Sequence, residues 1–285
     1  MQITVTAGKG GTGKTTVAAN FAIALSDELD VKLFDCDVEE PDAHIFLDPE
    51  FDSREPVVIK HPNIDQDKCT GCGVCSERCQ FNALAVVPNK TMFYPELCHG
   101  CGLCSLVCPE GAITEINHQI GVIESGKTKW FDFYQGLLTI GDPLAPPIIS
   151  QLKERIERGN LSILDSPPGT ACPAVEAIHG SDFALLVTEP TPFGLNDLKL
   201  AIEVCESLGV PFGVVVNRHG IGNKGVEKYC EEKNIPILMN IPDSRQIAEL
   251  YAEGKPFVTE IPDWKEKFVD LYREIASIVE EQNKS

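Results

Sequence analysis

The sequence predicts an α/β fold in which helices cover both faces of a mostly parallel sheet, with a small α+β domain inserted into it. Short, apolar, β-branched runs alternate with segments of helical periodicity over most of the 285 residues. Strands of a parallel sheet that are buried on both faces have this pattern. Between about residues 63 and 117 the alternation stops, and a cysteine-rich stretch with little helical periodicity takes its place.

The expected elements outside this stretch can be assigned in chain order. Strands are predicted at residues 2–6, 31–34, 161–165, 183–188, 212–216 and 235–239. Helices are predicted at residues 14–27, 144–158, 194–208, 223–233 and 263–281. The last helix carries an apolar stripe that includes Phe268, Leu271 and Ile275, which predicts packing on the sheet.

The cysteine-rich stretch contains an internal duplication. Cys79-Gln-Phe-Asn-Ala-Leu resembles Cys108-Pro-Glu-Gly-Ala-Ile, 29 residues further along. We therefore predict an inserted domain at residues 61–118, which divides the main domain into residues 1–60 and 119–285.

Composition limits the possible partners and compartments. The net charge of −19 and the pI near 4.7 disfavour nucleic acid and anionic membranes as partners, because both are negative. No apolar run reaches the ~20 residues of a membrane-spanning helix, and the N-terminus lacks the charged start of a secretory signal. The tight Cys-x2-Cys clustering favours metal thiolates over disulfides. We expect a cytoplasmic protein.

A glycine-rich segment follows the first strand and opens the first helix. It fits the phosphate-binding pattern G-x-x-x-x-G-K-[ST], in the strand–loop–helix context that the pattern requires. Its glycines allow backbone N–H groups to face phosphate oxygens, and the helix N-terminus adds positive potential. Lys14 can reach the β- and γ-phosphates, and the Thr15 hydroxyl can bind Mg²⁺. The predicted nucleotide-binding residues of this loop are Gly8, Gly10, Gly11, Thr12, Gly13, Lys14, Thr15 and Thr16.

Lys9 is a second lysine inside this loop. With it, the segment Lys9–Thr16 (KGGTGKTT) resembles the signature of the MinD/ParA family of deviant P-loop ATPases, in the superfamily of Mrp and the nitrogenase iron protein. The resemblance covers essentially the whole chain outside the insert. It implies an ATPase in which Lys9 reaches the nucleotide of a second subunit, so that ATP joins a homodimer, or a heterodimer with a paralogue.

Further positions carry the same resemblance. Asp37 matches the switch I aspartate that positions the attacking water, and Asp165 matches the switch II aspartate that holds Mg²⁺ through water. Lys9, Lys14, Asp37 and Asp165 are thus the implied catalytic residues. The resemblance also implies that Gly169 senses the γ-phosphate and that Asn217, Pro242 and Asp243 contact the base. For each of these residues taken singly, Asn217 included, a simple strand-end cap is the alternative.

The eight cysteines of the insert have the 2-2-3 spacing of bacterial ferredoxins with two [4Fe–4S] clusters. In that run the fourth cysteine of each set serves the other cluster. We therefore assign one cluster to Cys69, Cys72, Cys75 and Cys108, and the second to Cys98, Cys101, Cys104 and Cys79. Zinc is the alternative, because Cys-x2-Cys pairs also form zinc sites. The first run departs from the pattern at Gln80, where proline is usual.

Four cysteines remain outside these runs. Cys205 and Cys230 fall in predicted helices, and Cys36 lies between two aspartates. Cys172 follows Asp165 by seven residues, an offset similar to that of a cluster cysteine in the nitrogenase iron protein. A bridging cluster there needs a second cysteine, and none lies between Pro109 and Ala171, so a cysteine without metal is the alternative.

These features predict an ATP-dependent iron–sulfur protein. The first hypothesis is that the nucleotide state controls electron transfer through the two clusters to or from a protein partner. The second is an iron–sulfur cluster assembly scaffold or carrier that serves a client protein, although the C-terminal Cys-x2-Cys of such scaffolds is missing. A positioning or partitioning ATPase that carries clusters is the third.

Overall fold

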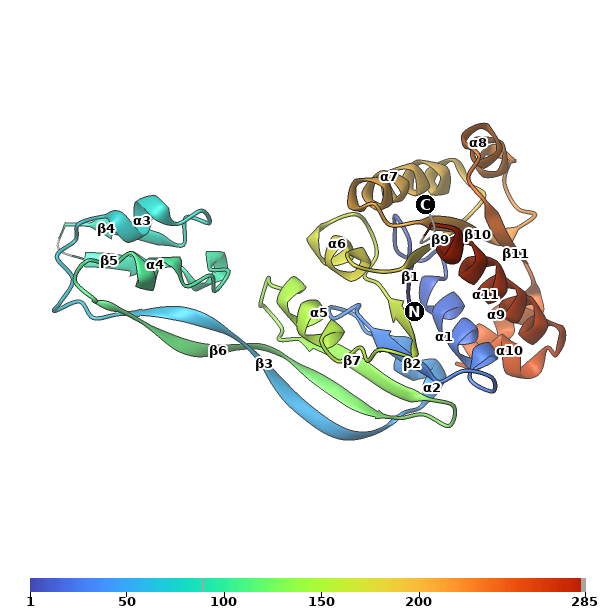
Figure 1. Ribbon diagram of the computed structural model, residues 1–285, viewed down its shortest axis with the longest axis horizontal. Coiled ribbons are helices and arrows are strands. Elements are labelled where there is room, and N and C mark those ends of the chain that lie inside the picture. The colour runs from blue at the N-terminus through green and yellow to red at the C-terminus, as the bar shows by residue number, and fades with distance from the viewer. Residues whose placement is uncertain (89, 283–285) are drawn as a thin grey trace.

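The computed structural model describes residues 1–88 and 90–282, in a body and a smaller lobe joined by a long two-stranded arm (Figure 1). The body is built on a nine-stranded sheet with the strand order β11-β10-β9-β1-β8-β2-β7-β6-β3. The strands are β1 (Gln2–Thr6), β2 (Val31–Asp35), β3 (Glu50–Ile64), β6 (Ile113–Lys127), β7 (Asp132–Leu138), β8 (Leu161–Asp165), β9 (Phe183–Thr188), β10 (Phe212–His219) and β11 (Ile237–Pro242).

Neighbouring strands from β11 to β7 run parallel, which confirms the predicted α/β fold with a mostly parallel sheet. Alternate side chains of these strands enter different cores. In β2, Leu33 joins the core beneath the N-terminal helix, while Phe34 joins the core on the other face. In β9, Leu185 and Leu186 divide in the same way. Burial on both faces explains the continuous apolar runs in the sequence.

Helices cover both faces of the sheet. One face is covered by α1 (Lys14–Leu25), α10 (Phe257–Glu260) and α11 (Asp263–Gln282). The opposite face is covered by α5 (Pro146–Lys153), α6 (Cys172–Ile178), α7 (Pro192–Leu208) and α8 (Gly225–Lys233). Two further helices are α2 (Ala43–Leu47) and α9 (Arg245–Ala252). No helix within the described residues has the length and apolar character needed to cross a bilayer.

The arm was not predicted from the sequence. It consists of β3 and β6, paired antiparallel from Glu50–Lys127 to Ile64–Ile113. β6 pairs with β7 only between Gly121 and Lys127, so the part of the arm beyond Gly121 leaves the sheet. The predicted boundaries after residues 60 and 118 fall inside the two strands. Pro56 and Pro62 argue against a strand in the sequence, but β3 is the edge strand of the sheet, where proline is tolerated.

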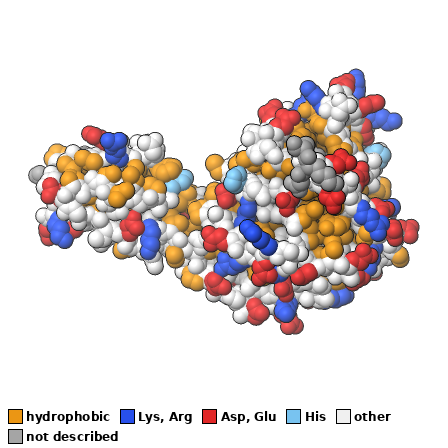
Figure 2. Space-filling model, viewed as in Figure 1, with side chains coloured by type: hydrophobic (Ala, Val, Ile, Leu, Met, Phe, Trp, Pro, Cys, Tyr) orange, Lys and Arg blue, Asp and Glu red, His pale blue; other side chains and the backbone are white. Residues whose placement is uncertain are grey.

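The lobe at the end of the arm is small and contains the cysteines. It comprises α3 (Val74–Arg78), β4 (Leu84–Val87), β5 (Lys90–Phe93), a 3₁₀ turn at Pro95–Leu97 and α4 (Leu103–Leu106). Figure 2 shows this lobe joined to the body by a narrower neck. Its buried apolar cluster is formed by Cys75, Leu84 and Ile113, with a few half-buried neighbours. So small a core is a weak source of folding energy.

Several predicted boundaries differ from the structure by a few residues, and two elements differ most. The helix predicted at 144–158 spans only Pro146–Lys153, because Arg155 and Ile156 form tighter i→i−3 turns that end it. The strand predicted at 235–239 begins two residues later, at Ile237.

We predict that Phe268→Ala destabilises the body by about 3–5 kcal/mol, because the fully buried ring of α11 packs against Phe21 and Phe257 and its loss leaves a cavity. Urea unfolding of the anaerobic protein, followed by circular dichroism, measures the change. Phe193→Ala is the matched control: its ring is 79% exposed, so a change within about 0.5 kcal/mol is expected. Equal losses in the two variants would contradict this account of the core.

Candidate functional site

The phosphate-loop segment forms a tight turn between β1 and α1. Gly11 and Gly13 adopt φ values of 80° and 89°, the left-handed region that glycine tolerates without strain. A Cβ on Gly13 would lie 2.3 Å from Nδ2 of Asn217, so only glycine fits there. Nδ2 of Asn217 in turn donates to the carbonyl oxygen of Thr12 at 2.7 Å. This bond fixes the loop against the end of β10.

Lys14 forms a buried ion pair with Asp165. Its Nζ donates to Oδ1 of Asp165 at 2.6 Å and lies 3.5 Å from Oγ1 of Thr15. Burial alone would lower the pKa of Lys14, but the charge of Asp165 and the hydrogen bond leave that pKa above its ordinary value. Burial raises the pKa of Asp165 against the opposing effect of Lys14. The pair joins the first residue of α1 to the last residue of β8.

Two further carboxylates, which the sequence analysis missed, lie beside Asp165. One oxygen each of Asp35, Asp42 and Asp165 lies within 4.8 Å of the others. Oδ1 of Asp42 and Oδ2 of Asp165 are buried and have no hydrogen-bond partner in the described part of the chain. Unpaired buried oxygens of this kind fit a hard divalent cation such as Mg²⁺. In the sequence, Asp35 directly follows the predicted strand 31–34, and Asp42 lies seven residues further along without a motif of its own.

Asp35 and Asp37 have different surroundings. Asp35 is fully buried and accepts hydrogen bonds from the backbone N–H groups of Asp37 and Ala43. Burial and the charge of Asp165 raise its pKa well above the ordinary value. Asp37 lines the open cleft, and burial raises the pKa of its carboxyl to about 6 against the opposing charge of Lys14. Asp37 is thus the carboxylate that faces the cleft.

The loop opens into a cleft of about 1300 Å³, counted out to open solvent. The predicted residues that line this cleft are Lys9, Gly10, Gly11, Gly13, Lys14, Thr15, Thr16, Asp37, Asn217, Pro242 and Asp243. Tyr251 and Phe257 add aromatic rings to its wall and were not predicted. Gly169, whose N–H donates to the carbonyl of Ala7 with a φ of 93°, and Gly8 belong to the backbone around the loop.

Lys9 is held by its own chain. Its Nζ lies 3.5 Å from Oε2 of Glu189, a buried carboxylate whose other oxygen accepts a hydrogen bond from Arg218 at 2.6 Å. Glu189, a further residue that the sequence analysis missed, therefore carries two cations beside the cleft.

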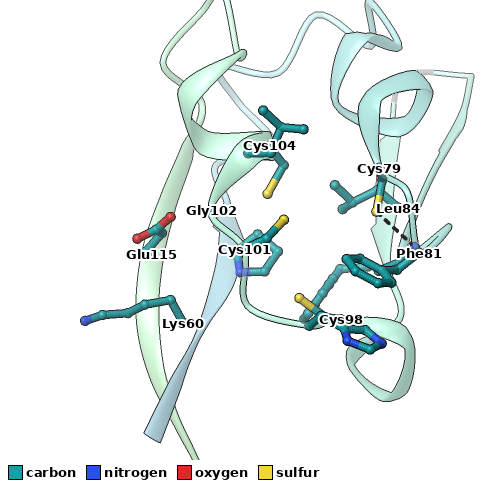
Figure 3. Close-up of a pocket in the computed structure, with 14 residues that line it drawn as sticks. Lys60, Cys79, Phe81, Leu84, Cys98, Cys101, Gly102, Cys104 and Glu115 are labelled. Carbon is teal, nitrogen blue, oxygen red and sulfur yellow. Dashed lines mark hydrogen bonds between the residues drawn. The ribbon is translucent and has the colours of Figure 1, made fainter. Parts of the chain in front are cut away.

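The eight cysteines of the lobe surround two cavities. Cys79, Cys98, Cys101 and Cys104 line the arm-side cavity, together with Lys60, Pro62 and Glu115 of the arm (Figure 3). Cys69, Cys72, Cys75 and Cys108 line the outer cavity. In Figure 3 the four labelled sulfurs point into a common space. All twelve cysteines, which lie within the described residues, are free of disulfides.

The backbone around both cavities directs N–H groups toward sulfur. The N–H of Ala83 donates to Sγ of Cys79, and that of Ala112 donates to Sγ of Cys108, both at 3.3 Å. Gly71, Gly73, Gly100 and Gly102 all have φ between 67° and 85°. Hydrogen bonds to sulfur stabilise thiolates and their metal complexes. Four convergent sulfurs with such bonds fit an iron–sulfur cluster in each cavity, and they also fit zinc.

The remaining cysteines are separate from both cavities. Cys172 is exposed and is the first residue of α6. Burial raises the pKa of the Cys205 thiol to about 12 and that of Cys230 to about 11, as expected for packing residues. Burial also raises the pKa of Cys36, and Asp35 adds to the shift.

Comparisons with known proteins agree with this geometry. The family model described as the CobQ/CobB/MinD/ParA nucleotide binding domain matches residues 3–257. Two uncharacterized proteins of Methanocaldococcus jannaschii are 34% and 30% identical, each over 90% of this chain and over 91% and 98% of their own lengths.

More distant similarities extend the comparison. A protein of Pyrococcus horikoshii named iron-sulfur cluster carrier protein is 26% identical over 90% of this chain and 79% of its own length. Among solved structures, the septum site-determining protein MinD of Pyrococcus horikoshii, complexed with Mg-ADP, matches with a TM-score of 0.61 and 22% identity, over 98% of both chains. At this sequence identity, the structural match supports a shared fold and nothing more.

We predict that Lys14→Met weakens binding of MgADP by about 10- to 100-fold, because a charged hydrogen bond to phosphate is lost. Calorimetric titration measures the affinity. Lys233→Met, at an exposed lysine of α8, is the control and should leave the affinity unchanged. An unaltered affinity in Lys14→Met would remove Lys14 from the site.

Proposed function

The chain belongs to the CobQ/CobB/MinD/ParA nucleotide-binding domain family, and on this basis we propose that it hydrolyses ATP and couples its nucleotide state to electron transfer through two [4Fe–4S] clusters. One observation carries the proposal. Two cavities, each lined by four cysteines, lie at the end of an arm. The strands of this arm continue into the sheet whose strand β1 leads into the phosphate loop.

The residues of the cleft have separate roles in the proposed ATPase. The loop N–H groups and Lys14 bind the phosphates, so Lys14 exchanges Asp165 for a phosphate oxygen. Mg²⁺ would be held by Thr15 and, through water, by Asp165, with Asp35 and Asp42 adding negative potential. Asp37, the carboxylate open to the cleft, orients the attacking water. Asn217, Pro242 and Asp243 contact the base.

We propose a homodimer in which Lys9 leaves Glu189 and contacts the nucleotide of the second subunit. Release requires only that the ion pair at 3.5 Å be replaced by a phosphate, a stronger partner for an ammonium group. A heterodimer with a paralogue is the alternative, supported by two relatives within one organism.

The lobe supplies the redox part of the proposal. A [4Fe–4S] cluster in each cavity would provide a one-electron centre. Four thiolates would hold each cluster, with a backbone hydrogen bond from Ala83 to Cys79 at the arm-side cavity and from Ala112 to Cys108 at the outer one. Cys72 and Cys101 are exposed, so each cavity has one edge that a protein electron donor or acceptor can approach.

A cluster carrier is the second candidate. The observation in its favour is the similarity to a protein named iron-sulfur cluster carrier, at 26% identity. Transfer of iron from the loaded protein to an apo-ferredoxin, at a rate that MgATP increases, would support it. Clusters that remain bound in the presence of a chelator would oppose it.

We predict that the anaerobically reconstituted protein binds about eight iron atoms. Cys79→Ser should lower the iron content and change the spectrum of the cluster held by Cys98, Cys101 and Cys104, because Cys79 lines that cavity. Iron and zinc analysis with EPR spectroscopy measures the result. Cys205→Ser, at a buried cysteine of α7, should keep all iron. Stoichiometric zinc in the protein as isolated, with no capacity for iron, would reject the cluster proposal.

The coupling itself is tested by stopped-flow oxidation of the reduced protein by a flavodoxin or methyl viologen. We expect MgATP to change the rate by about fivefold or more, because typical couplings between sites are 1–3 kcal/mol. Asp37→Asn, which keeps the shape of the side chain but not its charge, should bind ATP and slow its hydrolysis. A rate that is the same with and without nucleotide would contradict the proposed coupling.

A further inference from the structure

The arm has a defined root where it leaves the sheet. β3 and β6 pair in register on both sides of this point, but the register shifts between Val57–Gly121 and Val58–Gln119, so Ile120 is an extra residue in β6. The carbonyl of Ile120 accepts a hydrogen bond from the N–H of Thr139 at 2.8 Å. An extra residue of this kind bends a strand and interrupts its ladder. The root is therefore the point at which the arm can change direction.

Helix α5 packs directly on this root. A Cβ on Gly121 would lie 2.5 Å from Cδ1 of Ile148, so the missing side chain allows Ile148 to contact the backbone of β6. A Cβ on Gly136 of β7 would lie 2.9 Å from Cγ2 of Ile148 and 2.6 Å from Cγ1 of Val38. Ile148 is fully buried between these strands. It thus contacts the root of the arm beside Val38, the residue that follows Asp37.

The other end of α5 is bonded to α6. Nζ of Lys153 donates to three carbonyl oxygens at the end of α6, those of Glu176, Ala177 and His179, at 2.7, 3.3 and 2.5 Å. An ammonium group at this position donates hydrogen bonds to carbonyls that a helix end leaves unpaired. Its positive charge also interacts favourably with the negative end of the helix dipole. Helix α6 follows the segment 165–170 that contains Asp165 and Gly169. Lys153 therefore joins α5 to the far end of the helix that follows this segment.

We propose that Lys153 is a positioning residue that, through α5, transmits the nucleotide-dependent position of α6 to the root of the arm. This inference rests on the proposed function for its consequence, the control of the clusters. Val38 lies beside Ile148, near the start of α5, and α6 is bonded to Lys153 at its end. Movement of either one would therefore shift α5, whose Ile148 packs against Gly121. Beyond the root the arm continues from residue 58 to 64, roughly 20 Å at 3.3 Å per residue, so a small rotation displaces the lobe by several times the movement at the root.

The test is hydrogen–deuterium exchange of the anaerobic holoprotein, with and without MgATP, read at the amides of residues 57–59 and 119–122. In the wild type, MgATP should change exchange at these amides by about fivefold or more. Lys153→Met keeps the length of the stem and removes the donors. It should bind ATP and iron normally and lose the response at the root.

Lys32→Met is the control, because Lys32 is a buried lysine whose ammonium group donates to Glu157 and has no bond to α6 among the contacts described. It should keep the full response, and Lys153→Arg should restore most of it. If Lys153→Met fails to assemble, Ile148→Val tests the same link from the root and should weaken the response.

The outcomes separate the two proposals. A full response at the root in both Lys153→Met and Ile148→Val would overturn the role of Lys153 and α5. The role of Lys153 and α5 would also be overturned if the root amides of the wild type did not respond to MgATP. A wild type whose root responds through Lys153, but whose electron-transfer rate does not change with nucleotide, would support this inference and reject the proposed coupling.

Discussion

The buried ion pair between Lys14 and Asp165 is the interaction on which the site depends. A lysine buried at the start of α1 is costly without a partner, and the 2.6 Å contact to Asp165 supplies one. Asp35 and Asp42 add negative charge around the same point, so the site as it stands has more carboxylates than cations. A phosphate that takes Lys14 away from Asp165 leaves these carboxylates unbalanced, and a divalent cation restores the balance. Nucleotide and metal are therefore expected to bind together.

The arm joins the sheet close to the nucleotide site, so a change at Lys14 and Asp165 can affect the distant lobe. β7 lies next to β2 and runs parallel to it, and the N–H of Leu138 at its end donates to the carbonyl of Val38 at 2.8 Å. β6 and β3 then extend the same sheet edge outward into the lobe. Only β7 thus lies between the arm and β2, the strand that ends at Asp35. This attachment makes a mechanical link between nucleotide and lobe physically reasonable.

Much of the parallel sheet could be predicted from the sequence, because its strands are buried on both faces and read as continuous apolar runs. The phosphate loop could be predicted because its glycines are required by geometry, as the close approach of Asn217 to Gly13 illustrates. The arm could not. β3 is exposed over most of its length and contains two prolines, and neither β3 nor β6 has a long apolar run. Their pairing joins residues up to 77 positions apart, such as Glu50 and Lys127.

The cleft shows the same limit at the level of single residues. Asp35, Asp42 and Glu189 carry no motif of their own, and only the fold brings them to Asp165 and Lys9. By contrast, the spacing of the cysteines places three of each set in one short loop, and the ferredoxin pattern assigns the fourth to the other run, as the two cavities show.

In the proposed coupling, the state of the nucleotide site alters the redox centres in the lobe. The most direct test is an anaerobic, EPR-monitored potentiometric titration of the reconstituted protein, with MgATP, with MgADP and without nucleotide. The account predicts that at least one midpoint potential shifts between these states, by about 60 mV for a tenfold change in a one-electron equilibrium. Potentials that coincide in all three states, in a protein that demonstrably binds the nucleotide, would contradict it.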